Sequence, residues 1–197
     1  MRVGLISLLA AGGCIPHLEG SGVGDCDPWV APENEWTDDS LSGPPVGLCG
    51  EGYLNGQIAP DVRLTAQNDE TVSLWQFYGD VILLDVCTIW CVPCQHLGET
   101  ATATYTARAD QGFMYVTVIQ EDFEGNPPDH DDLNYWGDQF GIATPILGDT
   151  QDPRVTEDAI LNGFLPGVVV LDREMKVVAR VNPPDTDAVE AAIDAAL

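Results

Sequence analysis

Two cysteines three residues apart, Cys91 and Cys94, carry the clearest chemical signal in the sequence. They follow the apolar run Val81–Val86, which is typical of a buried strand in a parallel sheet. A Cys-x-x-Cys behind such a strand, with a helix-compatible stretch after it, suits reversible dithiol–disulfide chemistry. The positive end of a helix favours the thiolate of the leading sulfur, which is the attacking species. We therefore predict that Cys91 is the nucleophile and that Cys94 resolves the mixed disulfide.

Three neighbouring residues could support this exchange. Asp85 lies near the end of the apolar run, where a buried carboxyl has a raised pKa and can take the proton from Cys94. The alternative is that Asp85 points to solvent or caps a turn. Pro93 suits the first turn of a helix, where its missing N–H is no loss. Trp90 is expected to shield the disulfide and to form part of a docking surface, with plain packing as the alternative.

The other cysteines are expected to have structural roles. Cys26 and Cys49 flank a Pro/Gly/Asp-rich stretch, and an exported protein would join them as a structural disulfide. Cys87 is expected to be a buried free thiol that packs as a small hydrophobe. A bare Cys-x-x-Cys can also be half of a zinc site, but Cys26 and Cys49 do not supply the second closely spaced pair.

The N-terminus has the features of a targeting segment. Arg2 precedes a short apolar stretch, Val3–Ala11, and small residues lead to Cys14. The stretch is too short to cross a bilayer as a helix. Its end resembles a bacterial lipobox, which implies a signal peptide over residues 1–13 and a lipid on Cys14; an ordinary signal peptide or a mis-assigned start codon are the alternatives. The expected location is the periplasmic face of a bacterial membrane, an oxidising compartment where disulfides persist.

The composition limits the size of the protein and its partners. The 197 residues are 45% hydrophobic, enough for one medium domain, and carry 32 Asp and Glu against 7 Lys and Arg. A net charge of −25 without any basic patch excludes nucleic-acid binding. Residues 14–50 are rich in Gly, Pro and acidic side chains without periodicity, which predicts a flexible lead-in. The folded domain is expected over residues 51–197.

Hydrophobic periodicity predicts an α/β domain that positions the dithiol. A small hairpin comes first, with Asn68-Asp69 at its turn, and alternating strands and helices follow. The expected strands are 58–64, 71–74, 81–86, 114–119, 166–172 and 176–181, the last two antiparallel, and the expected helices are 94–110, 133–140 and 185–197.

The order of these segments resembles the thioredoxin superfamily, specifically its exported TlpA, ResA and redoxin-type members. The resemblance covers about two thirds of the chain. It is carried by Ile58–Val62, Val72–Leu74, Tyr78–Asp80, the apolar strand with Trp90–Cys94, and Leu165-Pro166 before Val168–Asp172. It implies a thioredoxin-like fold, with a central mixed sheet flanked by helices and an N-terminal hairpin. It also implies a buried acid at Asp85 and a cis peptide bond before Pro166, beside the dithiol.

The function implied by the resemblance is thiol–disulfide exchange outside the cytoplasm, without a cofactor or a metal. The expected partners are protein dithiols or disulfides and an upstream redox donor, with a lipid anchor in the membrane; we favour reduction of protein disulfides. Two positions depart from the family pattern. Cys87 stands where an aromatic residue is usual, and Gly167 stands where threonine is frequent.

Two other functions are compatible with parts of the motif. Thr88-x-x-Cys91 imitates the core of a peroxiredoxin, although Leu84 replaces the proline of that family. A copper chaperone would use Cys87, Cys91, Cys94 and His96 as soft ligands. However, the chaperones of this fold separate their cysteines by three residues, and the partner position for Cys91 is then Gln95.

Overall fold

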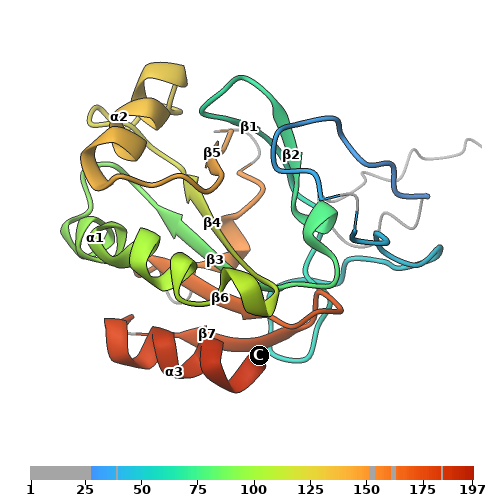
Figure 1. Cartoon of the computed structure of the whole chain (residues 1–197). Helices are drawn as coiled ribbons and strands as arrows, with labels where there is room; N and C mark the ends of the chain where they lie inside the picture. Colours follow the sequence, from blue (N-terminus) through green and yellow to red (C-terminus); the bar gives the residue numbers. More distant parts are fainter. Residues whose placement is uncertain (1–27, 39, 151–153, 161–162, 183) are drawn as a thin grey trace, which may run out of the picture.

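A computed structural model of the chain describes residues 28–38, 40–150, 154–160, 163–182 and 184–197. Within these ranges the chain forms one mixed sheet in the order β2-β1-β5-β4-β3-β6-β7 (Figure 1). β3, β4 and β5 run parallel to one another, whereas β6 is antiparallel to β3. The strands are β1 (Arg63–Ala66), β2 (Thr71–Ser73), β3 (Val81–Cys87), β4 (Phe113–Ile119), β5 (Ile146–Gly148), β6 (Gly167–Leu171) and β7 (Val177–Val181).

The side chains of β3 alternate between two apolar clusters, one on each face of the sheet. One cluster joins Val81, Leu83 and Cys87 to buried side chains of the three α-helices in the described ranges. The other joins Ile82, Leu84 and Val86 to the hairpin and a short 3₁₀ helix. Because both of its faces are covered, β3 gives rigid support to the segment that leads from it into α1. The helices are α1 (Val92–Thr106), α2 (His130–Phe140) and α3 (Thr186–Ala196), and the 3₁₀ helices are η1 (Leu74–Phe77), η2 (Ala109–Gln111) and η3 (Glu157–Ala159).

The predicted mixed sheet with flanking helices and an N-terminal hairpin is confirmed, and a further strand, β5, lies between the hairpin and β4. The sequence analysis missed β5 because three residues are too few to show a periodicity. β5 pairs in parallel with β4 and antiparallel with β1. The hairpin is therefore an extension of the central sheet, and its turn contains Asp69 at a positive φ of 64°.

Two helices begin earlier than their apolar patterns predict, because polar residues cap them. α1 begins at Val92, since Cys91 is the N-cap and its sulfur accepts from the backbone N–H of Cys94. α2 begins at His130, since Asp129 and Asp132 form a reciprocal capping box. Because capping fixes the residue at which α1 starts, it also fixes the position of Cys94 in the first turn of this helix.

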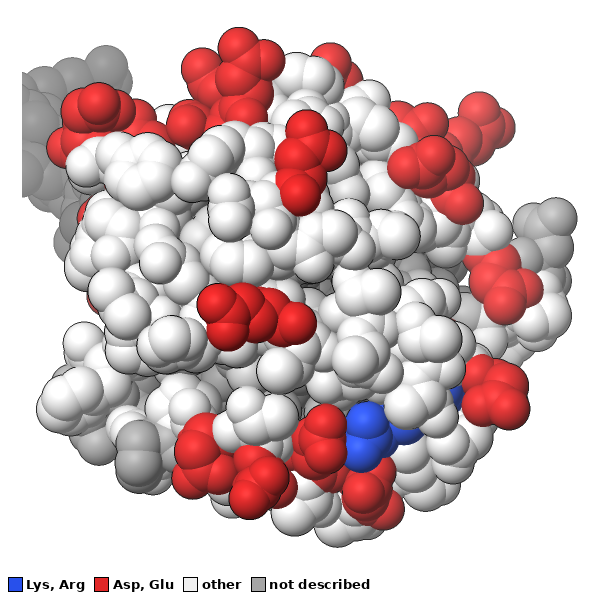
Figure 2. Space-filling model, turned by 60° about the vertical axis from the view of Figure 1, so that its left-hand side comes forward, with Lys and Arg blue, Asp and Glu red and all other residues white. Residues whose placement is uncertain are grey.

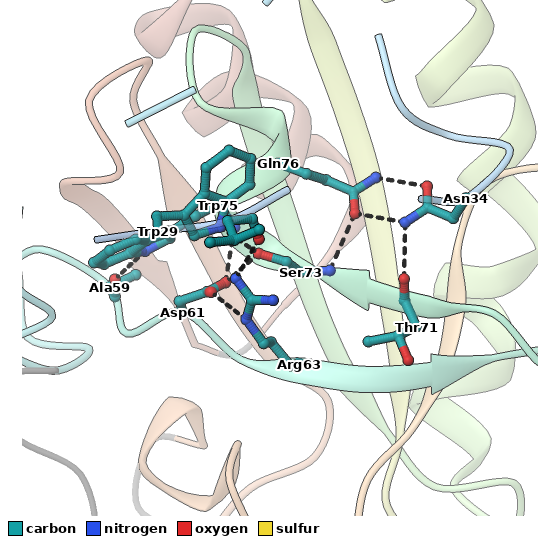
Figure 3. A network of polar contacts seen from close by, with 10 residues as sticks. Trp29, Asn34, Ala59, Asp61, Arg63, Thr71, Ser73, Trp75 and Gln76 are labelled. Carbon is teal, nitrogen blue, oxygen red and sulfur yellow. Dashed lines mark hydrogen bonds and ion pairs between the residues drawn. The ribbon is translucent and has the colours of Figure 1, made fainter. Parts of the chain in front are cut away.

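The described part of the predicted flexible lead-in has no helix or strand, but polar contacts hold it on the hairpin (Figure 3). The indole N–H of Trp29 donates to Ser73 Oγ at 2.9 Å. Ser73 in turn donates to Asp61 Oδ1 at 2.6 Å, an oxygen that also accepts from the backbone N–H of Trp75. The lead-in is thus fixed to the domain through side chains that are partly buried.

Asn34 makes the second attachment, along the edge strand β2. Its amide nitrogen donates to the Thr71 carbonyl at 2.8 Å and to Gln76 Oε1 at 2.9 Å. Gln76 returns a bond from Nε2 to Asn34 Oδ1 at 3.0 Å. Arg63 adds a bond to the carbonyl of Val30 at 2.8 Å. The lead-in therefore occupies part of the hydrogen-bonding edge that β2 would otherwise expose.

An Asn34→Ala substitution is expected to lower the free energy of unfolding by roughly 1–3 kcal/mol, because it removes the acceptor of the buried Gln76 amide. Urea unfolding at neutral pH measures this change. Glu33→Ala, at an exposed neighbouring position, is the matched control and should change stability little. Equal stability of the two variants would show that the contacts of Asn34 do not contribute to folding.

The described arginines form hydrogen bonds and ion pairs within the protein. Figure 2 shows acidic side chains spread over one face of the molecule, with only a small area of basic ones. Each described arginine donates to a carboxylate or to backbone carbonyls. The pairs are Arg63 with Asp61, Arg108 with Asp194, Arg154 with Glu121, Arg173 with Gly79 and Gln111, and Arg180 with Asp158 and Ala159. The surface field is therefore negative, which favours association with cationic rather than anionic partners.

Candidate redox site

Cys91 and Cys94 form a disulfide at the N-terminal end of α1, with their Cα atoms 5.2 Å apart. Cys91 is the N-cap residue and Cys94 lies in the first turn, three positions later. The backbone N–H of Cys94 points at Cys91 Sγ, with 3.3 Å between nitrogen and sulfur. This N–H and the helix dipole stabilise negative charge on the Cys91 sulfur once the disulfide is reduced.

The backbone before α1 is held in place by β3 and β4. The N–H of Ile89 donates to the Glu121 carbonyl at 3.0 Å, which continues the parallel pairing beyond the strand ends. The side chain of Gln95 donates to the Ile89 carbonyl at 2.9 Å. Pro93 lies in the first turn of α1, as the sequence predicts. These contacts place the disulfide at the carboxyl end of the central strand.

The two sulfurs differ in their access to solvent. Cys94 is fully buried, whereas Cys91 is 5% exposed. The exposed edge of Cys91 faces a groove of about 410 Å³. One wall of the groove is Trp90–Pro93 and the other is Gly163–Leu165. Of the two cysteines, Cys91 is thus the one that lines the groove, and the roles predicted for the two thiols stay predictions.

The second wall ends at the predicted cis peptide bond, and the Leu165-Pro166 bond is cis in the structure. Phe164 projects from this wall and is 62% exposed. The departure at Gly167 has a steric cause. A Cβ atom there would lie 3.0 Å from the Cα of Ile160 and 3.2 Å from the Ala159 carbonyl oxygen. A threonine, which the family often carries here, would therefore require the segment at η3 to shift by a few tenths of an ångström.

Trp90 is exposed, and a hydrogen bond sets its orientation. Its side chain is 48% exposed, and its indole N–H donates to Glu121 Oε2 at 3.0 Å. The other oxygen of Glu121 is paired with Arg154, which also contacts Glu157 at 3.7 Å. Trp90 lines one wall of the groove, and its expected part in shielding the disulfide and in docking stays a prediction.

Asp85 is buried, as the sequence predicts, and does not point to solvent. Only 1% of it is exposed. The Cys87 thiol donates to its Oδ1 at 2.9 Å, and the Tyr115 hydroxyl donates to its Oδ2 at 2.9 Å. Burial raises the pKa of Asp85 to about 6, although both hydrogen bonds act to lower it. The carboxyl therefore changes its protonation state in the neutral range.

Cys87 is a buried free thiol, as expected, but it is more than a small apolar side chain. Burial and the neighbouring Asp85 raise its pKa well above the usual range, so the thiol keeps its proton. The same two causes raise the pKa of Tyr115. Cys87 and Tyr115 are therefore neutral donors to the one carboxyl on this face of β3.

Two cysteine predictions depend on residues outside the described ranges. Cys49 takes part in a disulfide, whereas Cys26, its predicted partner, lies outside the described residues. Cys14 and the predicted signal peptide also lie outside them. Of the helices in the described ranges, none has the length and apolarity needed to cross a bilayer.

Sequence reasoning missed three contributors to the site: Tyr115, Phe164 and Glu121. In the Asp85 cluster, the sequence could have indicated only Cys87. Residues two apart on a strand share a face, so Cys87 lies on the same side of the strand as Asp85. Tyr115 reaches Asp85 through the pairing of β3 with β4, which the sequence does not specify. Glu121 and Phe164 lie outside regular elements, in connections whose course depends on the whole fold.

Comparisons with known proteins match this architecture. The family model described as the AhpC/TSA family matches residues 55–180. Among curated proteins, none has a sequence that matches this chain. The thioredoxin domain of a thiol-disulfide oxidoreductase from Bacteroides vulgatus is similar in structure, with a TM-score of 0.61 and 22% identity over 72% of this chain and 96% of that one.

Two further solved structures are similar to this chain. A thiol:disulfide interchange protein from Bacteroides sp. has a TM-score of 0.60 and 21% identity, over 72% of this chain and 89% of that one. A secreted disulfide oxidoreductase from Mycobacterium tuberculosis, described as homologous to Escherichia coli DsbE, has a TM-score of 0.56 and 14% identity, over 68% of this chain and 96% of that one. At these identities the likeness shows the fold, and the predicted thioredoxin-like fold is confirmed.

Proposed function

Since the chain belongs to the AhpC/TSA family, we propose that it is a thiol–disulfide oxidoreductase that reduces disulfides of other proteins. The observation that carries this proposal is the Cys91–Cys94 disulfide at the start of α1, with Cys91 alone open to a groove. An accessible leading sulfur and a buried second sulfur are what a two-step exchange requires.

The proposed reaction starts from the reduced dithiol. The Cys91 thiolate attacks one sulfur of the partner's disulfide, and the first partner sulfur leaves as a thiolate. Cys94 then loses its proton and attacks Cys91 Sγ in the mixed disulfide. The Cys91–Cys94 bond forms, the bond from Cys91 to the partner breaks, and the second partner sulfur leaves. The protein ends oxidised and its partner reduced by two electrons.

Asp85 is the proposed acceptor of the Cys94 proton. Its side chain lies on the face of β3 that α1 covers, because it alternates with Leu84 and Val86 of the opposite cluster. Its pKa of about 6 leaves most of the carboxyl ionised at pH 7, ready to accept a proton. A buried base is needed here because Cys94 has no contact with solvent.

The groove is the proposed docking surface for the partner. Trp90, Val92 and Phe164 give it exposed apolar side chains, and Leu165-Pro166 gives it a backbone edge next to Cys91. An extended segment with an apolar residue beside its cysteine fits such walls. Trp90 and Pro166 are thus assigned to substrate binding.

A Glu121→Ala substitution is expected to raise KM for a peptide disulfide about fivefold with kcat unchanged, because the Trp90 indole loses the bond that orients it. Steady-state kinetics measure the change, and the indole N–H resonance of Trp90 reports the lost bond. Glu124→Ala, at an exposed position in the following loop, is the control. If both variants have the wild-type KM, Trp90 needs no support from Glu121.

The proposed location is outside the cytoplasm. In support, the N-terminal sequence has the features of a lipoprotein signal over residues 1–13, with Cys14 as the lipid attachment site. Cys49 is disulfide-bonded, which suits an oxidising compartment, and we propose Cys26 as its partner. The Mycobacterium tuberculosis structure is described as secreted. We propose a bacterial membrane as the anchor and an upstream redox donor that regenerates the dithiol.

Equilibration of the full chain with glutathione buffers tests the proposed function. A reversible two-electron couple towards the thioredoxin end of the range, about −270 mV, is expected, and a value near about −120 mV would assign an oxidant instead. The same preparation should reduce a peptide disulfide faster than it consumes hydrogen peroxide. Faster peroxide consumption would identify a peroxidase, and tight copper binding without a reversible couple would identify a metal carrier.

A further inference from the structure

The polar cluster of Asp85, Cys87 and Tyr115 is buried in an otherwise apolar face of the sheet. At most 1% of each residue is exposed. Each carboxylate oxygen of Asp85 accepts one hydrogen bond at 2.9 Å, Oδ1 from the Cys87 thiol and Oδ2 from the Tyr115 hydroxyl. Buried polar groups with this degree of pairing favour one arrangement strongly, because losing either bond leaves a buried group unsatisfied.

The cluster lies on the face of the sheet that α1 covers. Cys87 belongs to the same apolar cluster as Cys91 and Cys94, and Asp85 lies between Leu83 and Cys87 on that face of β3. Tyr115 reaches the same carboxyl from the neighbouring strand β4. Two strands therefore converge on one carboxyl, on the face of the sheet whose apolar cluster contains the disulfide.

Both donors favour the ionised form of Asp85. A thiol and a phenol that keep their protons donate well to a carboxylate, whereas a protonated carboxyl has one oxygen that no longer accepts fully. Protonation of Asp85 therefore weakens one of the two bonds. Burial raises the pKa of Asp85, and the hydrogen bonds from Cys87 and Tyr115 act to lower it.

We propose that Cys87 and Tyr115 are positioning residues that hold Asp85 as an oriented base for the thiol of Cys94. This inference rests on the proposed function, and it gives Cys87 a part in disulfide exchange without any change in its own oxidation state. In the resolving step the proton passes from Cys94 Sγ to Asp85, while Cys94 Sγ bonds to Cys91 Sγ and the partner's sulfur departs. The departing thiolate takes a proton from solvent, Asp85 gives up its proton before the next cycle, and Cys87 and Tyr115 keep theirs throughout.

No other titratable group in the described ranges is placed to do the same work. On the sheet, Asp85 pairs with Thr117 of β4 and Val168 of β6, neither of which titrates. The titratable groups that α1 and its N-cap place on this face are the two cysteines of the disulfide and the phenol of Tyr105, which lies about three turns along the helix from Cys94. α3 packs here through Val189 and Ile193. Two of its acidic residues, Glu190 and Asp194, face Arg108, and the third, Asp187, is exposed in its first turn.

The test compares Cys87→Ala, Tyr115→Phe and Cys87→Ser in the full chain. Carboxyl ¹³C NMR of the reduced protein follows the titration of Asp85, and the pH profile of thiol release from a peptide disulfide follows the resolving step. The Ala and Phe variants are each expected to move both midpoints upward by roughly half to one pH unit. Cys87→Ser keeps a hydroxyl donor and should restore the wild-type midpoint.

Two controls separate positioning from packing. Thr117→Val alters a buried side chain beside Asp85 whose hydroxyl has no hydrogen-bond partner within the described residues, and it should leave the midpoint unchanged. In an Asp85→Asn background, Cys87→Ala should no longer change the pH profile. Unmoved midpoints in both single variants, or the same change without Asp85, would overturn the inference.

The inference and the proposed function fail in different ways. If the wild-type chain shows a reversible couple and reduces peptide disulfides but the midpoints do not move, only the roles of Cys87 and Tyr115 are wrong. If the wild-type chain has no reversible couple, the proposed function fails, and with it the assignment of a base for Cys94, whatever the NMR titration of Asp85 shows.

Discussion

A Cys94→Ser variant is expected to form a mixed disulfide with its substrate through Cys91 and to stop there. A serine hydroxyl is not ionised near neutral pH and cannot form a disulfide, so the bond between Cys91 and the partner persists. Turnover of a peptide disulfide should fall by about three orders of magnitude or more. Intact-protein mass spectrometry should show the adduct, in proportion to the peptide supplied and removable by a reducing agent.

The matched variant is Cys91→Ser, which should form no adduct, because the remaining sulfur of Cys94 has no access to the groove. An adduct on Cys94 in that variant would mean that the helix end opens more than its burial indicates. An adduct that resolves in Cys94→Ser would mean that a third thiol completes the cycle. Cys87 would be the thiol to examine, since it lies in the same buried cluster.

Asp85→Asn is expected to have two opposite effects, a more stable protein and a slower enzyme. The pKa of Asp85 is about 6 in the folded chain and 3.8 in a model peptide. Between these values the folded carboxyl still holds a proton that the unfolded chain has lost. The free energy of unfolding of the wild type therefore falls as the pH rises from about 4 to 6. Above that range this deficit, relative to pH 4, stays at about 3 kcal/mol.

The asparagine variant lacks this deficit, so it should be more stable than the wild type at pH 8 and similar to it at pH 4. Urea unfolding at several pH values measures the gap. Its disulfide exchange at pH 7 should be slower by about 10²-fold, because Cys94 has lost its proton acceptor. A gap that does not change with pH would show that Asp85 is not the titrating group, and unchanged exchange would show that it is not the base.

The sequence was sufficient for the parts of the site that lie close together in the chain. The Cys91–Cys94 pair, the buried acid on the preceding strand and Pro93 in the first helical turn all lie within a ten-residue segment whose pattern is local. The cis bond before Pro166 was predicted from the family resemblance and not from periodicity. Local pattern and motif therefore placed the reacting sulfurs.

The parts that could not be predicted depend on strand register and on loops. Tyr115 meets Asp85 because β4 pairs with β3 at one register, and a shift by one residue would turn the phenol to the other face. The bond from Trp90 to Glu121 joins residues 31 apart in the chain. β5 has only three residues, and its pairing with β1 is a tertiary contact. Long-range contacts of this kind leave no periodic trace in the sequence.

The attachment of the lead-in to the hairpin has a mechanical consequence. Trp29 and Asn34 bind Ser73 and Thr71 of β2, which lies on the right of Figure 1, whereas α1, which begins at the disulfide, lies on the left. With the proposed Cys26–Cys49 bridge, a pull on the chain ahead of Cys26 passes through the disulfide to Cys49, and the bonds of Trp29 and Asn34 lie inside the closed loop. Tension would then enter the domain at Cys49, ahead of the hairpin, and the bonds that hold the loop on β2 would carry none of it.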